Sequence, residues 1–331
     1  MKSKLSLVAL AVSLAFSYNA ASAADQSVVT QSGSGNNTSV TQSGNAALNI
    51  GFVTVTEAGN ANNTTVVQTG NASYSTARVT DNAGANNNTS SISQGGNIGA
   101  SGNIQNWGSL NTAGISQSGV AGPYGAYASI NQNGSVNSGA VNQSAGTDQS
   151  ATINQSQYGQ FGTYNTASAT QTGNMQTAAI EQGPGSYNVA ATNQSNTSNT
   201  ANVTQSGAAN TSYVTQVGTG IANLADVIQS GDSNYAALSQ NGSNLSASLT
   251  QSGDVNNANV NQSGLNNNAL LTQGGDLNVA NISQNGGGGL NTASLDQSGI
   301  NNLANITQSG QNFVSTNIQS GNNNVLNVVQ N

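Results

Sequence analysis

The amino-acid sequence predicts an all-β solenoid of about 13 two-strand coils, with two facing parallel sheets held together by Asn and Gln ladders. Three observations lead to this fold class. A glutamine recurs about every 11 residues, the side chains before it alternate with the period of a β-strand, and the chain is rich in primary amides.

The recurring glutamine, called the anchor below, divides the chain into 26 strand–turn units. Fifteen of the 25 intervals between anchors are 11 residues long, and the other ten range from 12 to 16. Early anchors include Gln94, Gln105 and Gln117, and two acids, Glu57 and Asp81, stand at anchor positions. In the more regular second half the anchors are Gln205, Gln216, Gln229, Gln240, Gln251, Gln262, Gln273, Gln284, Gln297, Gln308, Gln319 and Gln330.

The residues before each anchor follow a fixed pattern. Val, Ile or Leu stands two positions upstream in 22 of the 26 units, and Asn stands six positions upstream in 17. Four positions upstream is usually Ala, Ser or Thr, as Ala258 is before Gln262. These offsets differ by two, which is the strand period, so all of these side chains are expected to share the inward face. A helix would need apolar spacings of three and four, which the repeat lacks.

Each unit is predicted to end in a tight turn. Glycine stands two positions after the anchor in 19 units. Because glycine accepts a positive φ without a steric penalty, the Gln-Ser-Gly segment is expected to reverse the chain. The predicted turn glycines are Gly231, Gly253, Gly264, Gly275 and Gly310.

One strand of this kind buries too little apolar surface to fold alone, so stacking of the coils is expected to build the core. Stacking places each strand beside its equivalent in the next coil, about 4.8 Å away. A primary amide is both donor and acceptor, so each inward amide is expected to bond to its copies above and below. The Asn ladder is predicted to contain Asn223, Asn234, Asn256, Asn267, Asn278, Asn291 and Asn302.

The composition excludes several functions. The chain has 55 Asn and 30 Gln, no His, no Cys, and 3 basic against 10 acidic residues. Without His or Cys, zinc sites, cysteine nucleophiles and His-based triads are impossible. A nucleic-acid partner needs a basic face, which this chain cannot build. The composition therefore predicts a structural protein with no enzymatic activity and no cofactor.

The first 23 residues are expected to be a secretory signal peptide. Two lysines precede an apolar run over residues 5–16, and the Ala-Ser-Ala segment fits a cleavage site after Ala23. The run is too short to span a bilayer, and no membrane span is expected in the mature chain. Residues 24–331 are predicted to form a single solenoid, whose one basic residue is Arg78.

The two ends carry the functional prediction. Soluble solenoids need polar caps, because the last coil exposes unpaired N–H and C=O groups. The first repeat begins within a few residues of Ala24, and a full unit closes at Gln330, without a helix, a Pro-rich plug or a charge cluster. An uncapped stack is expected to pair with copies of itself and to grow into a fibril along the solenoid axis.

Three consecutive units resemble the curlin repeat, in which a Gln-x-Gly-x-x-Asn-x-Ala core leads to a second Gln. They begin at Gln251, Gln262 and Gln273. The resemblance covers essentially all of residues 24–331. It implies a secreted subunit of curli-type fibres, which are extracellular functional amyloid on the bacterial surface that serves adhesion, cell aggregation and biofilm matrix. It also implies a nucleator subunit and an outer-membrane secretion pore as partners, besides copies of the chain itself.

The chain departs from the curlin pattern in three ways. It has more repeats than typical members, and the Gly-rich secretion segment before the first repeat is missing or short. Nothing basic follows Arg78, whereas nucleator subunits of the family tend to carry basic residues late in the chain. This last difference favours a major, fibre-forming subunit.

Two sets of acids are candidates for a special role. Asp232, Asp254 and Asp276 are spaced by 22 residues and are expected to stack at one corner. They are either solvated turn residues or a ladder that binds calcium or repels neighbouring copies. Glu57 and Asp81 stand in the Gln ladder near the start of the chain. They either make the N-terminal coils poorer templates or are tolerated at a frayed end.

The alternative functions are a soluble solenoid adhesin and an ice-binding protein. An ice-binding solenoid would repeat Thr-x-Thr along a flat outer face, whereas Thr54-Val-Thr56 is an isolated case. A stable soluble monomer would favour either alternative over a fibre subunit.

Overall fold

The computed structural model describes residues 25–43, 51–70, 74–96, 99–120, 125–155, 162–218 and 221–331. The expected signal peptide and its cleavage after Ala23 lie outside these residues. Within the described ranges, no helix has the length and the apolar character that a membrane span requires.

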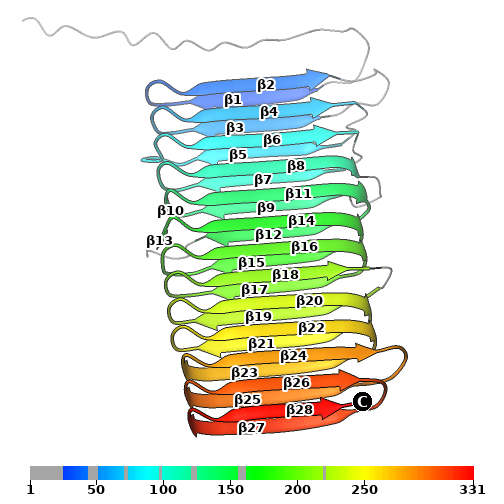
Figure 1. Cartoon of the computed structure of the whole chain (residues 1–331). Helices are drawn as coiled ribbons and strands as arrows, with labels where there is room; N and C mark the ends of the chain where they lie inside the picture. The colour runs from blue at the N-terminus through cyan, green and yellow to red at the C-terminus, as the bar shows by residue number, and fades with distance from the viewer. Residues whose placement is uncertain are drawn as a thin grey trace, which may run out of the picture.

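The described residues form a β-solenoid of two 13-stranded parallel sheets, as the sequence predicts (Figure 1). Sheet A consists of β1 (Gln26–Gln31), β3 (Phe52–Glu57), β5 (Thr76–Asp81), β7 (Ser101–Asn106), β9 (Tyr127–Gln132), β12 (Ser150–Gln155), β15 (Thr177–Gln182), β17 (Thr200–Gln205), β19 (Leu224–Ser230), β21 (Ser246–Ser252), β23 (Asn268–Asp276), β25 (Thr292–Ile300) and β27 (Val314–Asn322).

Sheet B consists of β2 (Asn37–Ser43), β4 (Asn63–Thr69), β6 (Thr89–Gly95), β8 (Thr112–Val120), β11 (Ser138–Gly146), β14 (Thr166–Asn174), β16 (Val189–Thr197), β18 (Thr211–Val217), β20 (Tyr235–Ser243), β22 (Asn257–Leu265), β24 (Val279–Gly286), β26 (Leu303–Ser309) and β28 (Val325–Gln330). The short strands β10 (Gly134–Ser135) and β13 (Gly162–Thr163) pair with each other beside the main sheets. One strand of sheet A and the following strand of sheet B make one coil.

The strands stack in register, because each coil repeats the inward pattern of the one before it. Leu238 of β20 pairs with Val260 of β22. Gln240 and Gln262 pair in the same two strands. Burial alternates along each strand, so Ala, aliphatic and ladder Gln side chains line the space between the sheets and every second side chain faces outward. This two-residue alternation is what selects a strand over a helix.

In every coil after the first, the turn from sheet A to sheet B holds a non-glycine residue in the left-handed region. Val255 and Leu277 have φ values of 58° and 60°, although bulky and β-branched residues rarely adopt them. Their backbone N–H groups donate to the carbonyls of Asp232 and Asp254 in the preceding coil, at 2.9 and 3.0 Å. Hydrogen bonds between coils therefore stabilise a conformation that the local sequence alone disfavours.

Candidate functional site

The Gln ladder of sheet B runs without a break through all 13 strands. Each Nε2 group donates to Oε1 of the Gln in the next coil, from Gln42 to Gln330, at 2.8 to 3.0 Å. Every one of these bonds has the same direction, from the earlier coil to the later one. The predicted residues in this ladder are Gln216, Gln240, Gln262, Gln284, Gln308 and Gln330.

Each ladder glutamine uses its second N–H across the core. Gln262, for example, donates to the carbonyl of Ser246 at 2.9 Å as well as to Gln284 at 2.8 Å. Its own Oε1 accepts from Gln240. The side chain is 0% exposed, yet both N–H groups and the carbonyl oxygen are paired. Repetition of the coil thus removes the free-energy cost of burying a polar amide.

Sheet A has the same ladder from Gln132 onward, with bonds of 2.7 to 3.0 Å. It contains the remaining predicted glutamines, which are Gln205, Gln229, Gln251, Gln273, Gln297 and Gln319.

Before Gln132 the ladder of sheet A changes, and one predicted anchor is wrong. Asn106, rather than Gln105, pairs with Asp81 on one side and with Gln132 on the other. The side chain of Asn106 is buried, whereas that of Gln105 lies on the outward face. Ile104, two positions before Asn106, supplies the inward aliphatic side chain. The residue two positions before Gln105 is Asn103, so the alternation already pointed to Asn106.

Glu57 and Asp81 occupy neighbouring positions of the sheet A ladder and are both 0% exposed. The expectation that they are tolerated at a frayed end is wrong, because both lie buried in paired strands. Desolvation by burial raises the pKa of Asp81 to about 6. A hydrogen bond from Asn106 lowers this pKa, and the carboxyl of Glu57 raises it.

The Asn ladder is continuous in sheet B, where all 13 coils have Asn immediately before the strand. Its bonds differ from the expected Asn-to-Asn side-chain pairs. Oδ1 of Asn234 accepts the backbone N–H of Asn256 at 3.0 Å, and Nδ2 donates to the carbonyl of Gly253 at 2.8 Å. The amide therefore joins the backbones of two coils. The predicted residues of this type are Asn234, Asn256, Asn278 and Asn302 in sheet B, and Asn223 and Asn291 in sheet A. Asn267 is an exception, because its Nδ2 donates to the carbonyl of Ser263 in its own coil and its buried Oδ1 has no hydrogen-bond partner in the described part of the chain.

The predicted turn glycines lie where consecutive coils approach closely. Gly253 has a φ of 93°, and a Cβ there would overlap the carbonyl oxygen of Gly275 in the next coil. Gly231, Gly264 and Gly275 are in the same situation, while a Cβ on Gly310 would contact the ring of Phe313. Glycine is therefore needed both for its backbone conformation and for its lack of a side chain.

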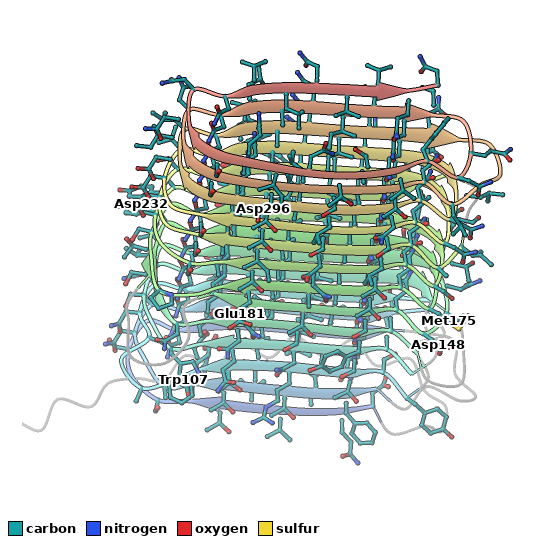
Figure 2. All side chains as sticks on the ribbon, turned by 90° about the horizontal axis from the view of Figure 1, so that it is seen from below. Trp107, Asp148, Met175, Glu181, Asp232 and Asp296 are labelled. Atoms are coloured by element: carbon teal, nitrogen blue, oxygen red, sulfur yellow. The ribbon has the colours of Figure 1, made fainter. Side chains whose placement is uncertain are left out.

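Asp232, Asp254 and Asp276 stack at one edge of the solenoid, where Figure 2 shows Asp232. Oδ1 of Asp254 accepts the backbone N–H of Asp232 at 2.8 Å, and Oδ1 of Asp276 accepts that of Asp254 at 2.9 Å. In other turns an Asn side chain accepts this backbone N–H, as Asn322 accepts that of Ile300, so these carboxylates take the role of an Asn side chain. Over the described ranges, no group of three or more His, Cys, Asp or Glu side chains could hold a metal ion.

The end coils leave their ladders half-satisfied. At the C-terminal end, Gln330 accepts from Gln308 and donates one N–H to the carbonyl of Val314, and its second N–H finds no acceptor among the described residues. At the N-terminal end, Gln42 donates to Gln68 and Gly51, and its Oε1 receives no donor from the described residues. One end thus offers donors and the other offers acceptors. The outermost strands β1, β2, β27 and β28 each have one unpaired edge within the described sheets.

The fold and its ladders define a β-solenoid of strand–turn repeats. Residues 197–220 and 220–253 match the curlin associated repeat, so this segment of the chain contains curlin repeats. No curated protein matches the chain significantly.

Proposed function

We propose that this chain is a secreted structural subunit that polymerises into extracellular curli-type amyloid fibres on the bacterial surface. In this role it supports adhesion, cell aggregation and biofilm matrix, and it is a major subunit rather than an enzyme. Its partners are copies of itself, a nucleator subunit and an outer-membrane secretion pore. The curlin repeats at residues 197–253 support this assignment.

The complementarity of the two end coils carries the proposal. Stacking β27 on β1 and β28 on β2 of a second copy would place Gln319 beside Gln31 and Gln330 beside Gln42. The free N–H groups would then meet the free Oε1 atoms in the direction that every Gln–Gln bond of the solenoid already has. Inward aliphatic residues that are only partly buried in the end coils, such as Val40 and Val328, would also become covered. A head-to-tail contact of this kind does not close on itself and produces a filament.

The same contact would continue the Asn ladder. Nδ2 of Asn324 donates to the carbonyl of Ser320 in its own coil. Oδ1 of Asn324 is the last acceptor of the Asn ladder in sheet B. In the next copy, the backbone N–H of Asn36 would donate to Oδ1 of Asn324, just as the backbone N–H of Asn324 donates to Oδ1 of Asn302. Ladder continuity therefore favours one register between copies over all others.

The test is assembly of residues 24–331 released from denaturant at micromolar concentration, with and without preformed seeds. Thioflavin fluorescence and fibre diffraction would follow the reaction. Seeded growth with a meridional reflection at about 4.7–4.8 Å would support the proposal. A stable, β-rich soluble monomer would contradict it and would favour a soluble adhesin or an ice-binding protein.

A further inference from the structure

The ladder of sheet A contains two carboxyl groups. Glu57 of β3 and Asp81 of β5 are register partners on adjacent strands, and neither side chain is exposed. Everywhere else in the two ladders, from Gln132 in sheet A and from Gln42 in sheet B, a neighbouring pair is joined by an amide N–H. Neither carboxyl group has an N–H to offer, so this step is chemically different from the others.

The hydrogen bonds around the pair are arranged with one donor missing. Nε2 of Gln31 donates to Oε2 of Glu57 at 2.7 Å. From the opposite side, Nδ2 of Asn106 donates to Oδ1 of Asp81 at 2.7 Å, against the direction of the other ladder bonds. Oε1 of Glu57 and Oδ2 of Asp81 are buried without a hydrogen-bond partner. Both amides thus donate toward the pair, and two acceptor atoms are left between them.

No cation among the described residues balances the pair. The strands next to it, β1 and β7, and the facing strands β2, β4 and β6 contain no titratable side chain. Arg78 lies on β5 but faces outward from the sheet, and Asp25 precedes β1 and accepts the backbone N–H of Gly51. Two buried negative charges on neighbouring strands would carry the full cost of desolvation and of mutual repulsion.

We propose that Glu57 and Asp81 share one proton in the folded solenoid and form a buried proton-binding site between the second and third coils. The O–H of one carboxyl group donates to the free oxygen of the other, which supplies the missing ladder bond and leaves the pair with one negative charge instead of two. Folding of the N-terminal coils is therefore coupled to proton uptake. Burial also raises the pKa of Asp226 on β19, whereas the strands β24 and β26 contain no titratable side chain. This proposal does not depend on polymerisation.

Hydrogen–deuterium exchange of the full mature chain tests the site. Corrected for intrinsic exchange rates, protection of β3 and β5 is expected to fall about 100-fold as the pH rises from 4 to 8, because each unit of pKa shift corresponds to a tenfold change. Protection of β24 and β26, which contain no titratable side chain, is expected to stay constant in the same sample. At pH 5 the wild type should show more carboxylic-acid C=O absorption in the infrared spectrum than a variant without the two acids, and this excess should disappear by pH 8.

The matched variant is Glu57→Gln with Asp81→Asn, which keeps the side-chain shapes and restores an N–H to each position. It should fold, lack the excess carboxylic-acid absorption and show equal protection of β3 and β5 at both pH values. Asp232→Asn, which removes an exposed acid, should keep the wild-type pH dependence.

Three results would overturn the proposal. They are equal protection of wild-type β3 and β5 at both pH values, pH dependence that persists in the double variant, and protection at pH 8 that returns on adding Ca²⁺ alone, which would indicate a cation site. Failure to form fibres at any pH would count against the proposed function and would leave the exchange result interpretable.

Discussion

Asn317 points into the core from β27, while its neighbour Ile318 points outward and is 75% exposed. This order reverses that of the preceding strand β25, where Leu295 faces inward at the position of Asn317. The ladder explains the reversal, because Gln297 donates to Gln319 at 2.7 Å and so fixes the register of β27. A shift by one residue would bury Ile318 but would turn Gln319 outward.

Replacing Asn317 with Val should therefore stabilise the C-terminal coil. The variant places an aliphatic side chain opposite Leu295, and we expect a gain of about 1 kcal/mol in the free energy of unfolding. Denaturant unfolding of freshly refolded monomer would measure it. Thr316→Val, an aliphatic change on the outward face of the same strand, should give no comparable gain. Equal effects of the two substitutions would argue against the register described here.

Replacing a ladder glutamine should lower the free energy of unfolding far more than replacing Gln105. Gln240→Ala removes the acceptor of Gln216 and the donor of Gln262, so two buried polar groups lose their partners. We expect a loss of about 3 kcal/mol in unfolding free energy. Gln105→Ala should change stability by less than about 0.5 kcal/mol. Denaturation curves of both variants would check this, and a large effect at Gln105 would contradict its outward position.

Close approach of the coils makes a sharp prediction at Gly253. Gly253→Ala introduces a Cβ at a φ of 93° against the carbonyl of Gly275, and should cost about 2 to 4 kcal/mol. Gly287→Ala is the control, since a Cβ at Gly287 meets nothing within 4 Å. Thermal unfolding should therefore separate the two variants clearly. Similar melting temperatures would show that the turn can relax.

The pKa of Asp81 predicts the direction of the pH dependence of stability. Burial raises this pKa from the ordinary 3.8 to about 6, so the folded state binds a proton more tightly than the unfolded chain. Stability is then greatest below pH 4 and declines as the pH rises through about 6. At pH 7, Asp81→Asn should gain about 3 kcal/mol relative to the wild type, and at pH 3 almost nothing. A stability difference that does not change with pH would contradict the assigned pKa.

Fibre growth should depend on backbone donors at the C-terminal edge. Outward-facing residues donate their N–H to the following coil, as Thr292 does to Phe313 at 2.7 Å and Leu303 to Asn324 at 2.8 Å. Thr316 also faces outward, and β27 is the last strand of sheet A, so the backbone N–H of Thr316 is free to donate to a second copy. Thr316→Pro removes this donor without removing a hydrogen bond inside the subunit, so seeds should no longer elongate with this variant. Thr316→Ala should elongate normally in the same thioflavin assay.

Much of the fold was predictable from the sequence, because the inward pattern has a strict two-residue period and an amide that stacks on its own copy. The repeat predicts the strands, the positions of the turn glycines and the pairing of Gln240 with Gln262. Asn106 was missed because a glutamine at the adjacent position continued the 11-residue spacing. The bonds of Asn234 to backbone groups and the left-handed conformation of Val255 depend on contacts between coils, which a single repeat does not contain.

The common direction of the ladder bonds has an electrical consequence. Backbone dipoles largely cancel in a β-sheet, but the side-chain amides of sheet B all point the same way from Gln42 to Gln330. Their dipoles therefore add along the axis, as peptide dipoles add in a helix. A filament built by head-to-tail stacking would be a polar rod whose moment grows with its length. Such rods should align in an external electric field and generate second-harmonic light.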